Sequence, residues 1–366
     1  MTSAAVPFQL GYRRSLDGLR GVAILLVVAN HGGLLRDGYG FIGVNTFFVL
    51  SGFLITSLLI LEQEAHGSVK LSFFYLRRAL RLLPALLAML AAFLIYALAT
   101  MSGRELVNTL HEEFWALFYF TNWAKILQLG PSLQMAHTWS LSLEEQFYFC
   151  WPWLLLFLLR RNSRPSLLCW VILGVTLSEA IRVFLFTGNL HLAYDQLDRL
   201  ITGLDTRADS LLLGAAVAVA ATSNLLPLGS ISRRLIALFS VLSVLGLAGL
   251  GLFRMLSPGM VYAGWLAASV CAAVLIMQLI VNTAGPINRL LEMTALVYVG
   301  RISYSLYVWH FPIAKILDRY KLAPPDHYWP YWTAIFPAAL ASYYLIERPC
   351  LRLKRRFQRT EPARPI

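Results

Sequence analysis

The sequence predicts an all-α fold, a polytopic bundle of transmembrane helices, and three observations indicate it. Of the 366 residues, 58% are hydrophobic and only 14% are charged, whereas a soluble domain has about 25% charged residues. The mean hydropathy is +0.63. A transmembrane helix needs about 20 mostly apolar residues, and runs of that length recur along almost the whole chain. No soluble domain of ordinary size is left over.

About ten apolar runs are candidate spans. They lie at approximately 17–35, 41–61, 80–101, 141–159, 166–187, 208–222, 235–253, 259–281, 294–317 and 330–347. We expect an N-terminal tail at 1–16, the transmembrane domain at 17–347 and a basic tail at 348–366. A further stretch near 113–129 is short and rich in aromatic residues. We expect it to be an outer interfacial or re-entrant segment.

The positions of Lys and Arg orient these spans, because basic loops favour the cytoplasm. If 113–129 does not cross the membrane, every strongly basic loop falls on one side together with both tails. If it does cross, the basic loops at 160–164 and 233–234 change sides. We therefore expect both termini in the cytoplasm. We attribute the formal net charge of +12 to the Lys and Arg residues that orient the chain in the membrane. No nucleic-acid partner is expected.

The four cysteines suggest neither a disulfide framework nor a metal site, because their spacing fits neither. Cys150, Cys169 and Cys271 lie in or beside apolar runs, and Cys350 lies in the basic tail. The first apolar run lacks a small-residue cleavage site, so we expect the mature protein to keep it.

The first span, in "RSLDGLRGVAILLVVANHGG", carries an arginine and a histidine at its two ends. Arg20 and His31 are eleven residues apart, about 16 Å of rise and about 20° of rotation on a helix. They therefore share one face, which should point into the bundle, because a central arginine costs about 2.5 to 3.5 kcal/mol in the bilayer. Alternatively, Arg20 snorkels to the headgroups and His31 is a hydrogen-bonded interior histidine.

Two further motifs gather charge at span ends. "FYLRRALRLLP" brings Arg77, Arg78 and Arg81 into an arrangement suited to phosphates, or to a generic positive-inside anchor. "HTWSLSLEEQFYFCWP" opens the fourth span with Glu144 and Glu145. Adjacent carboxylates cannot face the same partner on a helix, so one of them faces inward. Helix capping is the alternative account of this motif.

Other polar residues fall near the outer ends of spans. They are Asn45, Ser51, His137, Trp139, Asp205, Arg207, Asp209, Tyr304 and His310. Under the predicted topology His31, Asn45, Glu145, Arg207 and His310 lie at similar depth, which predicts one shared site. Each alone is equally a satisfied polar residue between helices. Glu179 and Arg182, three residues apart in the fifth span, are interpreted as a structural ion pair.

Taken in order, "SLDGLRGVAILLVVANHGG", "GVNTFFVLSGFLIT", "FYLRRALRLLP", "HTWSLSLEEQFYFCWP", "RADSLLLG" and "ISYSLYVWHFPI" resemble the integral-membrane O-acyltransferases of acyltransferase family 3. These enzymes acylate cell-envelope sugars and some secondary metabolites. The resemblance covers nearly the whole chain and implies the bacterial cytoplasmic (inner) membrane. Some members append an extracytoplasmic SGNH domain. The chain resembles the stand-alone form, for which a second transfer step would need a separate extracytoplasmic transferase.

The resemblance also implies roles for these residues. The donor is cytoplasmic acyl-CoA, most often acetyl-CoA, and no metal is implied. Its phosphates would bind Arg78 and Arg81, with Arg20 and Arg77 beside them. His31, with an unperturbed pKa of about 6.5, would be the general base that activates a hydroxyl of a carbohydrate, glycolipid or other acceptor.

The remaining roles follow the same resemblance. Glu144 or Glu145 would orient the imidazole of His31, and His310 joins this catalytic group. Asn45, Tyr304 or backbone amides would donate to the developing oxyanion. The expected substrate-binding residues are Asn45, Ser51, His137, Trp139, Tyr304, Asp205, Arg207 and Asp209.

Other readings stay open at this point. The acceptor could be a macrolide-like secondary metabolite, and an acyl-histidine relay is a variant of the same enzyme. A transporter or flippase of a lipid-linked sugar would also have many spans with polar groups at one depth. Against it, the chain has no repeated halves and its arginines cluster at one face. The oligomeric state is not readable from the sequence.

Overall fold

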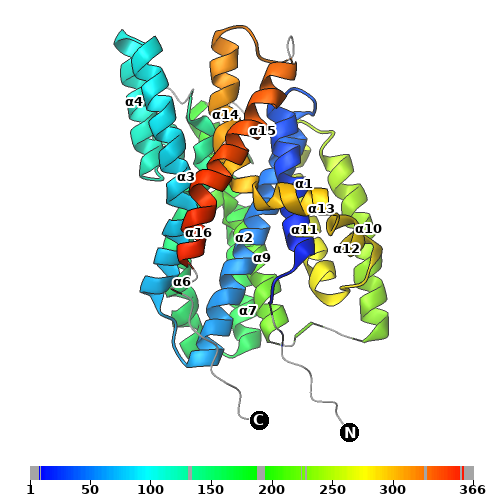
Figure 1. Ribbon diagram of the computed structural model, residues 1–366. Helices are drawn as coiled ribbons and strands as arrows, with labels where there is room; N and C mark the ends of the chain where they lie inside the picture. Colours follow the sequence, from blue (N-terminus) through cyan, green and yellow to red (C-terminus); the bar gives the residue numbers. More distant parts are fainter. Residues whose placement is uncertain are drawn as a thin grey trace.

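In a computed structural model, the structure describes residues 8, 10–130, 134–187, 194–223, 225–226, 229–324, 328–354 and 357. The described residues form helices and turns without a strand, which confirms the all-α expectation. Figure 1 shows the long helices gathered side by side into one bundle, with shorter helices at its upper end and across its front.

The helices follow one another with short connections. Their bounds are α1 Arg14–His31, α2 Asp37–His66, α3 Leu71–Thr100, α4 Gly103–Leu117, α5 Thr121–Ile126, α6 Trp139–Arg161, α7 Arg164–Thr187, α8 Tyr194–Thr202, α9 Leu204–Thr222, α10 Ser230–Leu250, α11 Trp265–Val281, α12 Pro286–Leu291, α13 Thr294–Arg301, α14 Ser303–Arg319, α15 Tyr328–Ser342 and α16 Arg348–Lys354. A 3-10 turn, η1 (Ala136–Thr138), precedes α6, and π turns η2 (Met260–Gly264) and η3 (Tyr343–Glu347) flank α11 and α15.

Among the described residues, five helices are long and apolar enough to cross a membrane. They are α2, α3, α7, α10 and the continuous helix Met260–Val281, which joins η2 to α11. The protein is therefore membrane-embedded, and a total of about ten spans stays a prediction. The expectation of one unbroken helix over 294–317 was wrong, because Ile302 separates α13 from α14.

The aromatic stretch near 113–129 folds into the short helices α4 and α5. The turn between them contains Tyr119 at φ 53°. Asn122 of α5 donates to Gln146 Oε1 of α6 at 3.1 Å, and Gln146 Nε2 donates to the Tyr119 carbonyl at 3.0 Å. The stretch thus turns back onto the start of α6, while α4 lies beside the upper part of α3 (Figure 1).

Glycines bring the helices that carry the site into close contact. A Cβ on Gly18 of α1 would lie 1.7 Å from the Leu291 carbonyl oxygen, and one on Gly300 of α13 would lie 1.8 Å from the Asp17 oxygen. Small residues at such positions are typical of helix packing in membranes. They seat α1 against α12 and α13 and so fix the direction in which Arg20 points.

Contacts at the two ends of the bundle show which helix ends lie together. Arg164, at the start of α7, pairs with Glu64 near the end of α2 at 2.6 Å. At the other end, Arg319 closes α14 and donates to the Thr100 carbonyl at the end of α3 at 3.0 Å. The starts of α3 and α7 and the end of α2 therefore lie at one end of the bundle.

Candidate functional site

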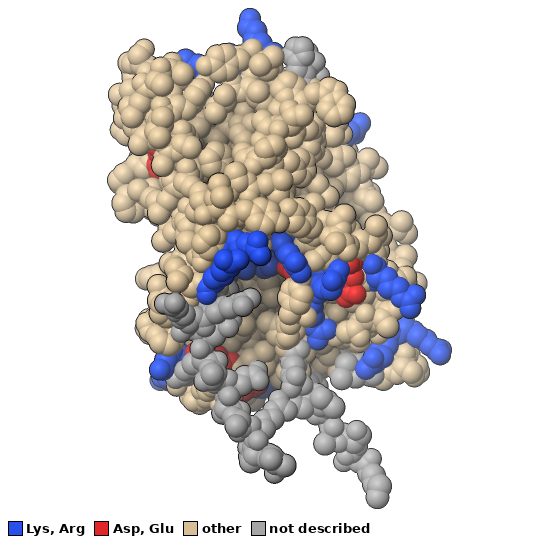
Figure 2. Space-filling model, in the orientation of Figure 1, with Lys and Arg blue, Asp and Glu red and all other residues tan. Residues whose placement is uncertain are grey.

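A cavity of about 710 Å³, counted with its open side, lies among α1, α2, α3, α6 and α14. We name it the arginine cavity, and its polar lining residues are Arg20, Ser51, Arg78, Arg81, Ser140, Glu144, Tyr148, Ser303, Tyr304 and Tyr307. Figure 2 shows one face of the molecule hollowed below its middle, with Lys and Arg side chains along the upper rim of the hollow.

The arginines of this cavity are only partly neutralised. Arg20 lies 3.6 Å from Asp17. Arg78 stacks over the Tyr148 ring, with its guanidinium carbon 3.8 Å from the ring centroid, and its buried Nε has no partner. Neither Arg78 nor Arg81 forms a salt bridge with a carboxylate of the described residues. The cavity therefore offers positive charge to an anion.

Arg77, predicted to join these arginines, points elsewhere. Its Nη2 contacts Glu62 Oε2 at 3.1 Å, and its Nη1 donates to the Phe357 carbonyl at 3.0 Å. It ties the end of α2 to the segment after α16 and does not line the cavity. The turn of about 100° between successive helix residues separates it from Arg78.

The two adjacent glutamates face different spaces. Glu144 lines the arginine cavity, where it accepts hydrogen bonds from Ser51 at 3.0 Å and from Tyr148 at 3.2 Å. Glu145 lines a second opening of about 920 Å³ between α3 and α6, together with Gln146. Arg78 lines both spaces. The structure thus identifies Glu144 as the carboxylate of the arginine cavity.

Three histidines lie behind Tyr307, a residue that lines the arginine cavity, and do not line the cavity themselves. The ring centroid of His310 lies 5.0 Å from that of His31 and 5.5 Å from that of His137. Phe311 packs on His31 at 5.3 Å and on His137 at 5.1 Å. His137 and His310 are buried, whereas His31 is exposed as a residue at the end of α1 although its ring packs against His310 and Phe311. We call His31, His137 and His310 the histidine cluster.

Backbone carbonyls hold the three imidazoles. His31 Nδ1 lies 3.1 Å from the Val27 oxygen, and His310 Nδ1 lies 2.6 Å from the Tyr307 oxygen. A proton on Nδ1 serves these two bonds and leaves Nε2 as the basic nitrogen of His31 and His310. In His137 it is Nε2 that lies at a carbonyl, 3.2 Å from the Val308 oxygen. The expectation that Glu144 or Glu145 orients His31 was wrong, because the Val27 carbonyl one helical turn earlier takes that place.

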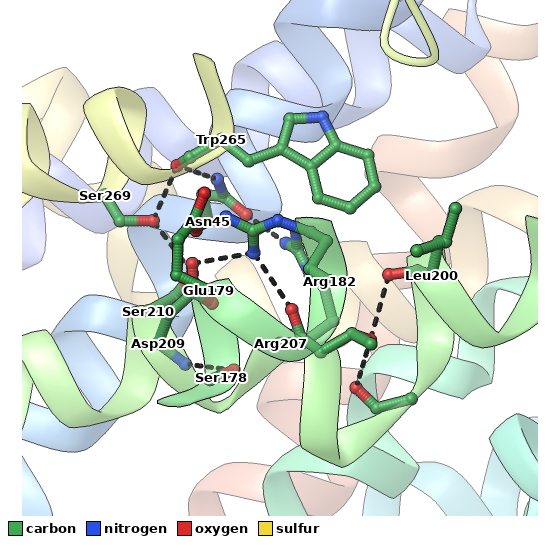
Figure 3. A network of polar contacts seen from close by, with 12 residues as sticks. Asn45, Ser178, Glu179, Arg182, Leu200, Arg207, Asp209, Ser210, Trp265 and Ser269 are labelled. Carbon is green, nitrogen blue, oxygen red and sulfur yellow. Dashed lines mark hydrogen bonds and ion pairs between the residues drawn. The ribbon is translucent and has the colours of Figure 1, made fainter. Parts of the chain in front are cut away.

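The residues predicted at equal depth do not form one site. Asn45 and Arg207 belong to a buried network that Figure 3 shows, in which Arg207 donates to Asn45 Oδ1. Arg182 pairs there with Glu179 and, at 2.8 Å, with Asp209. Of the predicted set, His31 and His310 do meet, whereas Asn45 and Arg207 do not join them, because depth does not set the direction in which a side chain points.

This network is packed with aromatic rings and is separate from the arginine cavity and the histidine cluster. The Arg207 guanidinium lies 4.4 Å from the Phe41 ring centroid and 4.8 Å from that of Trp265. Asn45 Nδ2 donates to the Trp265 carbonyl at 3.3 Å. Asp205 lies outside the network, where it pairs with Arg199 at 2.7 Å. Asn45 is therefore not free to donate to a substrate.

The remaining predicted residues lie around the cavity. Tyr304 lines it, and its hydroxyl donates to the Leu82 carbonyl at 2.7 Å. Trp139 packs edge-on against Phe48, a wall residue, at 6.0 Å. In the part of the chain that the structure describes, no group of three or more His, Cys, Asp and Glu is arranged to hold a metal ion.

Glu347 is a buried carboxylate that the sequence reasoning missed. Its Oε2 accepts a hydrogen bond from Ser305 at 2.9 Å. The positive charges of Arg81 and Arg20 attract its carboxylate. The signal for it was present, because a lone acidic residue at the end of an apolar run is a candidate for function in a membrane protein.

The helical fold and the arginine cavity define the class as a membrane-embedded protein with an internal polar cavity suited to an anion. The particular family follows from comparison. A family model described as an acyltransferase domain matches residues 13–348, and the chain belongs to this acyltransferase family.

Two relatives carry names that describe an activity. The peptidoglycan O-acetyltransferase OatA of Listeria monocytogenes is 30% identical over 354 residues, which cover 92% of this chain and 56% of that protein. The O-acetyltransferase OatA of Staphylococcus aureus is 31% identical over 352 residues, which cover 92% and 57%. The chain thus spans little more than half the length of these relatives. No solved structure matches.

Proposed function

We propose that the protein is an integral-membrane O-acyltransferase that moves an acyl group from acyl-CoA to a hydroxyl of a cell-envelope carbohydrate or glycolipid. The observation that carries this proposal is the arginine cavity, whose lining residue Tyr307 packs against the histidine cluster. Similarity to O-acetyltransferases, one named for peptidoglycan, supports acetyl as the group transferred and the cell wall as the location of the acceptor.

The arginine cavity suits the donor. Coenzyme A carries phosphates, and guanidinium groups bind phosphate through charge-assisted hydrogen bonds. Arg78 and Arg81 have no carboxylate partner among the described residues, and Arg20 lines the same wall. With the phosphates at these arginines, the thioester enters toward Ser140 and Tyr307 at the inner end.

His31 is the general base in this proposal. Its Nδ1 is held by the Val27 carbonyl, so Nε2 is the nitrogen that takes the proton from the acceptor hydroxyl. The acceptor oxygen then adds to the thioester carbon and forms a C–O bond, and the C–S bond breaks in the following step. The CoA thiolate leaves and receives the proton that His31 had taken.

The proposal also includes the orientation of the protein in the membrane. About ten spans with both termini in the cytoplasm of a bacterium would present the arginine cavity to cytoplasmic acyl-CoA. His31 closes α1 and would then face the outer side, where the cell-envelope acceptor lies. A transfer onward from this site would use a separate extracytoplasmic protein.

Calorimetry with acetyl-CoA on the detergent-purified protein tests the donor site. The double variant Arg78→Ala, Arg81→Ala should bind at least about 100-fold more weakly than wild type, because each lost charged hydrogen bond contributes roughly 1.5 to 3 kcal/mol. The matched control is Arg160→Ala, Arg161→Ala, which removes two exposed positive charges at the end of α6. It should bind as wild type does.

The outcomes separate the proposal from its rivals. Equal loss in both double variants would mean that general electrostatic attraction, not a built site, holds the donor. No binding to folded wild type would favour a transporter or another donor. In a transfer assay, His31→Ala should lower kcat about 100-fold to 10,000-fold, and full activity would remove His31 from the mechanism.

A further inference from the structure

Two hydroxyl groups close the inner end of the arginine cavity. Ser140, in the first turn of α6, and Tyr307, in α14, both line it, and their hydroxyls are hydrogen-bonded to each other. Tyr307 Oη donates to the His137 carbonyl at 2.9 Å, and Ser140 Oγ donates to the same oxygen at 3.3 Å. Each hydroxyl has one proton, so at most two of these three contacts form at once, and the His137 carbonyl is a neutral acceptor within reach of both hydroxyls.

This pair lies between the arginines and the histidine cluster. The Tyr307 ring centroid is 5.4 Å from that of His310 and 5.7 Å from that of His137. His310 in turn contacts His31. A group that enters the cavity past the arginines therefore meets the two hydroxyls where the cavity approaches the histidines.

The two side chains that the sequence offered as donors to a carbonyl oxygen are already engaged. The Tyr304 hydroxyl is held by the Leu82 carbonyl at 2.7 Å, and the Asn45 amide belongs to the separate Arg207 network. The Ser140 and Tyr307 hydroxyls are also paired, but their shared acceptor is a neutral amide carbonyl. An oxygen that gains negative charge is a stronger acceptor and takes such protons in its place.

From this geometry we infer that Tyr307 and Ser140 bind the carbonyl oxygen of the donor thioester and stabilise the negative charge that forms on it. The inference rests on the proposed function. As the acceptor oxygen adds to the thioester carbon, the carbonyl π electrons move onto oxygen, where both hydroxyls donate. When the C–S bond breaks, those electrons re-form the carbonyl and the two hydroxyls return to the His137 oxygen.

Infrared spectroscopy of bound acetyl-CoA, labelled with ¹³C at the thioester carbonyl, tests this directly and needs no acceptor. Hydrogen bonds lower a carbonyl stretching frequency, so the bound band should lie below that of free acetyl-CoA. Tyr307→Phe and Ser140→Ala should each move it back toward the free value, and the double variant should move it further.

The chain offers matched controls for both substitutions. Tyr331→Phe also removes a buried hydroxyl that donates to a backbone carbonyl, that of Val28 at 3.1 Å. Ser142→Ala removes a buried hydroxyl that donates to Thr138 at 3.0 Å. Tyr331 and Ser142 do not line the arginine cavity. The thioester band should be unchanged in these controls.

Kinetics supply a second readout. Tyr307→Phe should lower kcat about 100-fold to 1,000-fold, as loss of one oxyanion donor does elsewhere, with the KM for acetyl-CoA nearly unchanged. A rise in KM with constant kcat would contradict the inference. If acetyl-CoA binds to wild type and the band stays in place in Tyr307→Phe and Ser140→Ala, the inference is wrong and the donor site stands. If acetyl-CoA does not bind to folded wild type, both fail.

Discussion

Two arginine–aspartate pairs near α9 differ in burial, and this difference decides what each contributes to stability. Arg182 and Asp209 are both 0% exposed and 2.8 Å apart. Arg199 and Asp205 lie 2.7 Å apart, but their side chains are 47% and 31% exposed. Removing one member of a buried pair leaves an uncompensated charge away from water, whereas an exposed pair is screened by solvent.

We therefore expect Arg182→Met to destabilise the protein by about 3 to 5 kcal/mol. Arg199→Met, the matched control, should cost at most about 1 kcal/mol. Thermal unfolding of the purified protein in one detergent, followed by loss of the monodisperse species, measures both. Similar unfolding temperatures for the two variants would mean that Arg182 is not essential to the buried network.

For single residues, the sequence predicts where charged side chains gather better than it predicts which side chains contact one another. Arg78 and Arg81 could be assigned to one wall because a spacing of three residues places side chains on one helix face. The Asn45 to Arg207 contact and the Tyr307 to Ser140 contact could not be predicted. Each joins helices far apart in the chain, and a helix that is apolar all round gives no signal of which face meets which neighbour.

Among the elements, α2 and α9 make a close contact through glycine. A Cβ on Gly214 of α9 would lie 1.9 Å from the Val49 oxygen of α2, and one on Gly52 of α2 would lie 1.8 Å from the Leu211 oxygen of α9. No real Cβ contact is that short, so a side chain would have to push backbone against backbone. Helix α2 carries Asn45 and Ser51, and α9 carries Arg207. The distance between the two helices therefore affects both the arginine cavity and the buried Arg207 network.

Gly214→Ala should therefore lower stability by about 1 to 3 kcal/mol, as overpacking does in tight interiors. Gly249→Ala in α10 is the control, because nothing lies within 4 Å of its added Cβ. It should be neutral or stabilise by about 0.5 to 1 kcal/mol, since alanine loses less backbone entropy in a helix. Equal loss in the two variants would contradict the close contact, and thermal unfolding measures both.

The break between α13 and α14 shows why element boundaries were harder to predict than element type. The only proline of the apolar run 294–317, Pro312, lies inside α14, and the local signal near the break is the weak one of Gly300 and Ser303 on either side of it. The break lies where α13 packs across α1, with Gly300 against the Asp17 backbone. A contact between segments so far apart in the chain cannot be predicted from the local sequence pattern.

Across the whole molecule, the basic loops gather at one end. Arg164 lies with the end of α2. Arg233, at the start of α10, accepts a hydrogen bond on its carbonyl from Asn282, just after α11, at 3.0 Å. The far end of α10 meets the start of α2, where Arg36 donates to the Leu252 carbonyl at 3.1 Å. The starts of α7 and α10 thus share the end of the bundle where α2 finishes.

By the positive-inside rule we expect this basic end to face the cytoplasm, and cysteine labelling in intact cells tests this expectation. After replacement of Cys150, Cys169, Cys271 and Cys350, a single cysteine is introduced as Ser163→Cys or as Ser102→Cys. Ser163 is exposed between α6 and α7 at the basic end, and Ser102 is exposed just after α3 at the opposite end. Both exchanges replace a hydroxyl by a thiol of similar size, so they form a matched pair.

A maleimide that cannot cross the membrane should label Ser102→Cys in intact cells and Ser163→Cys only after lysis. This result would mean that the arginine cavity is accessible to cytoplasmic acyl-CoA and that His31 lies toward the outer side. The reverse pattern would invert the bundle and remove the cytoplasmic donor from the proposed function. Labelling of both sites in intact cells would mean that residues between 102 and 163 cross the membrane an even number of times, which contradicts the predicted topology.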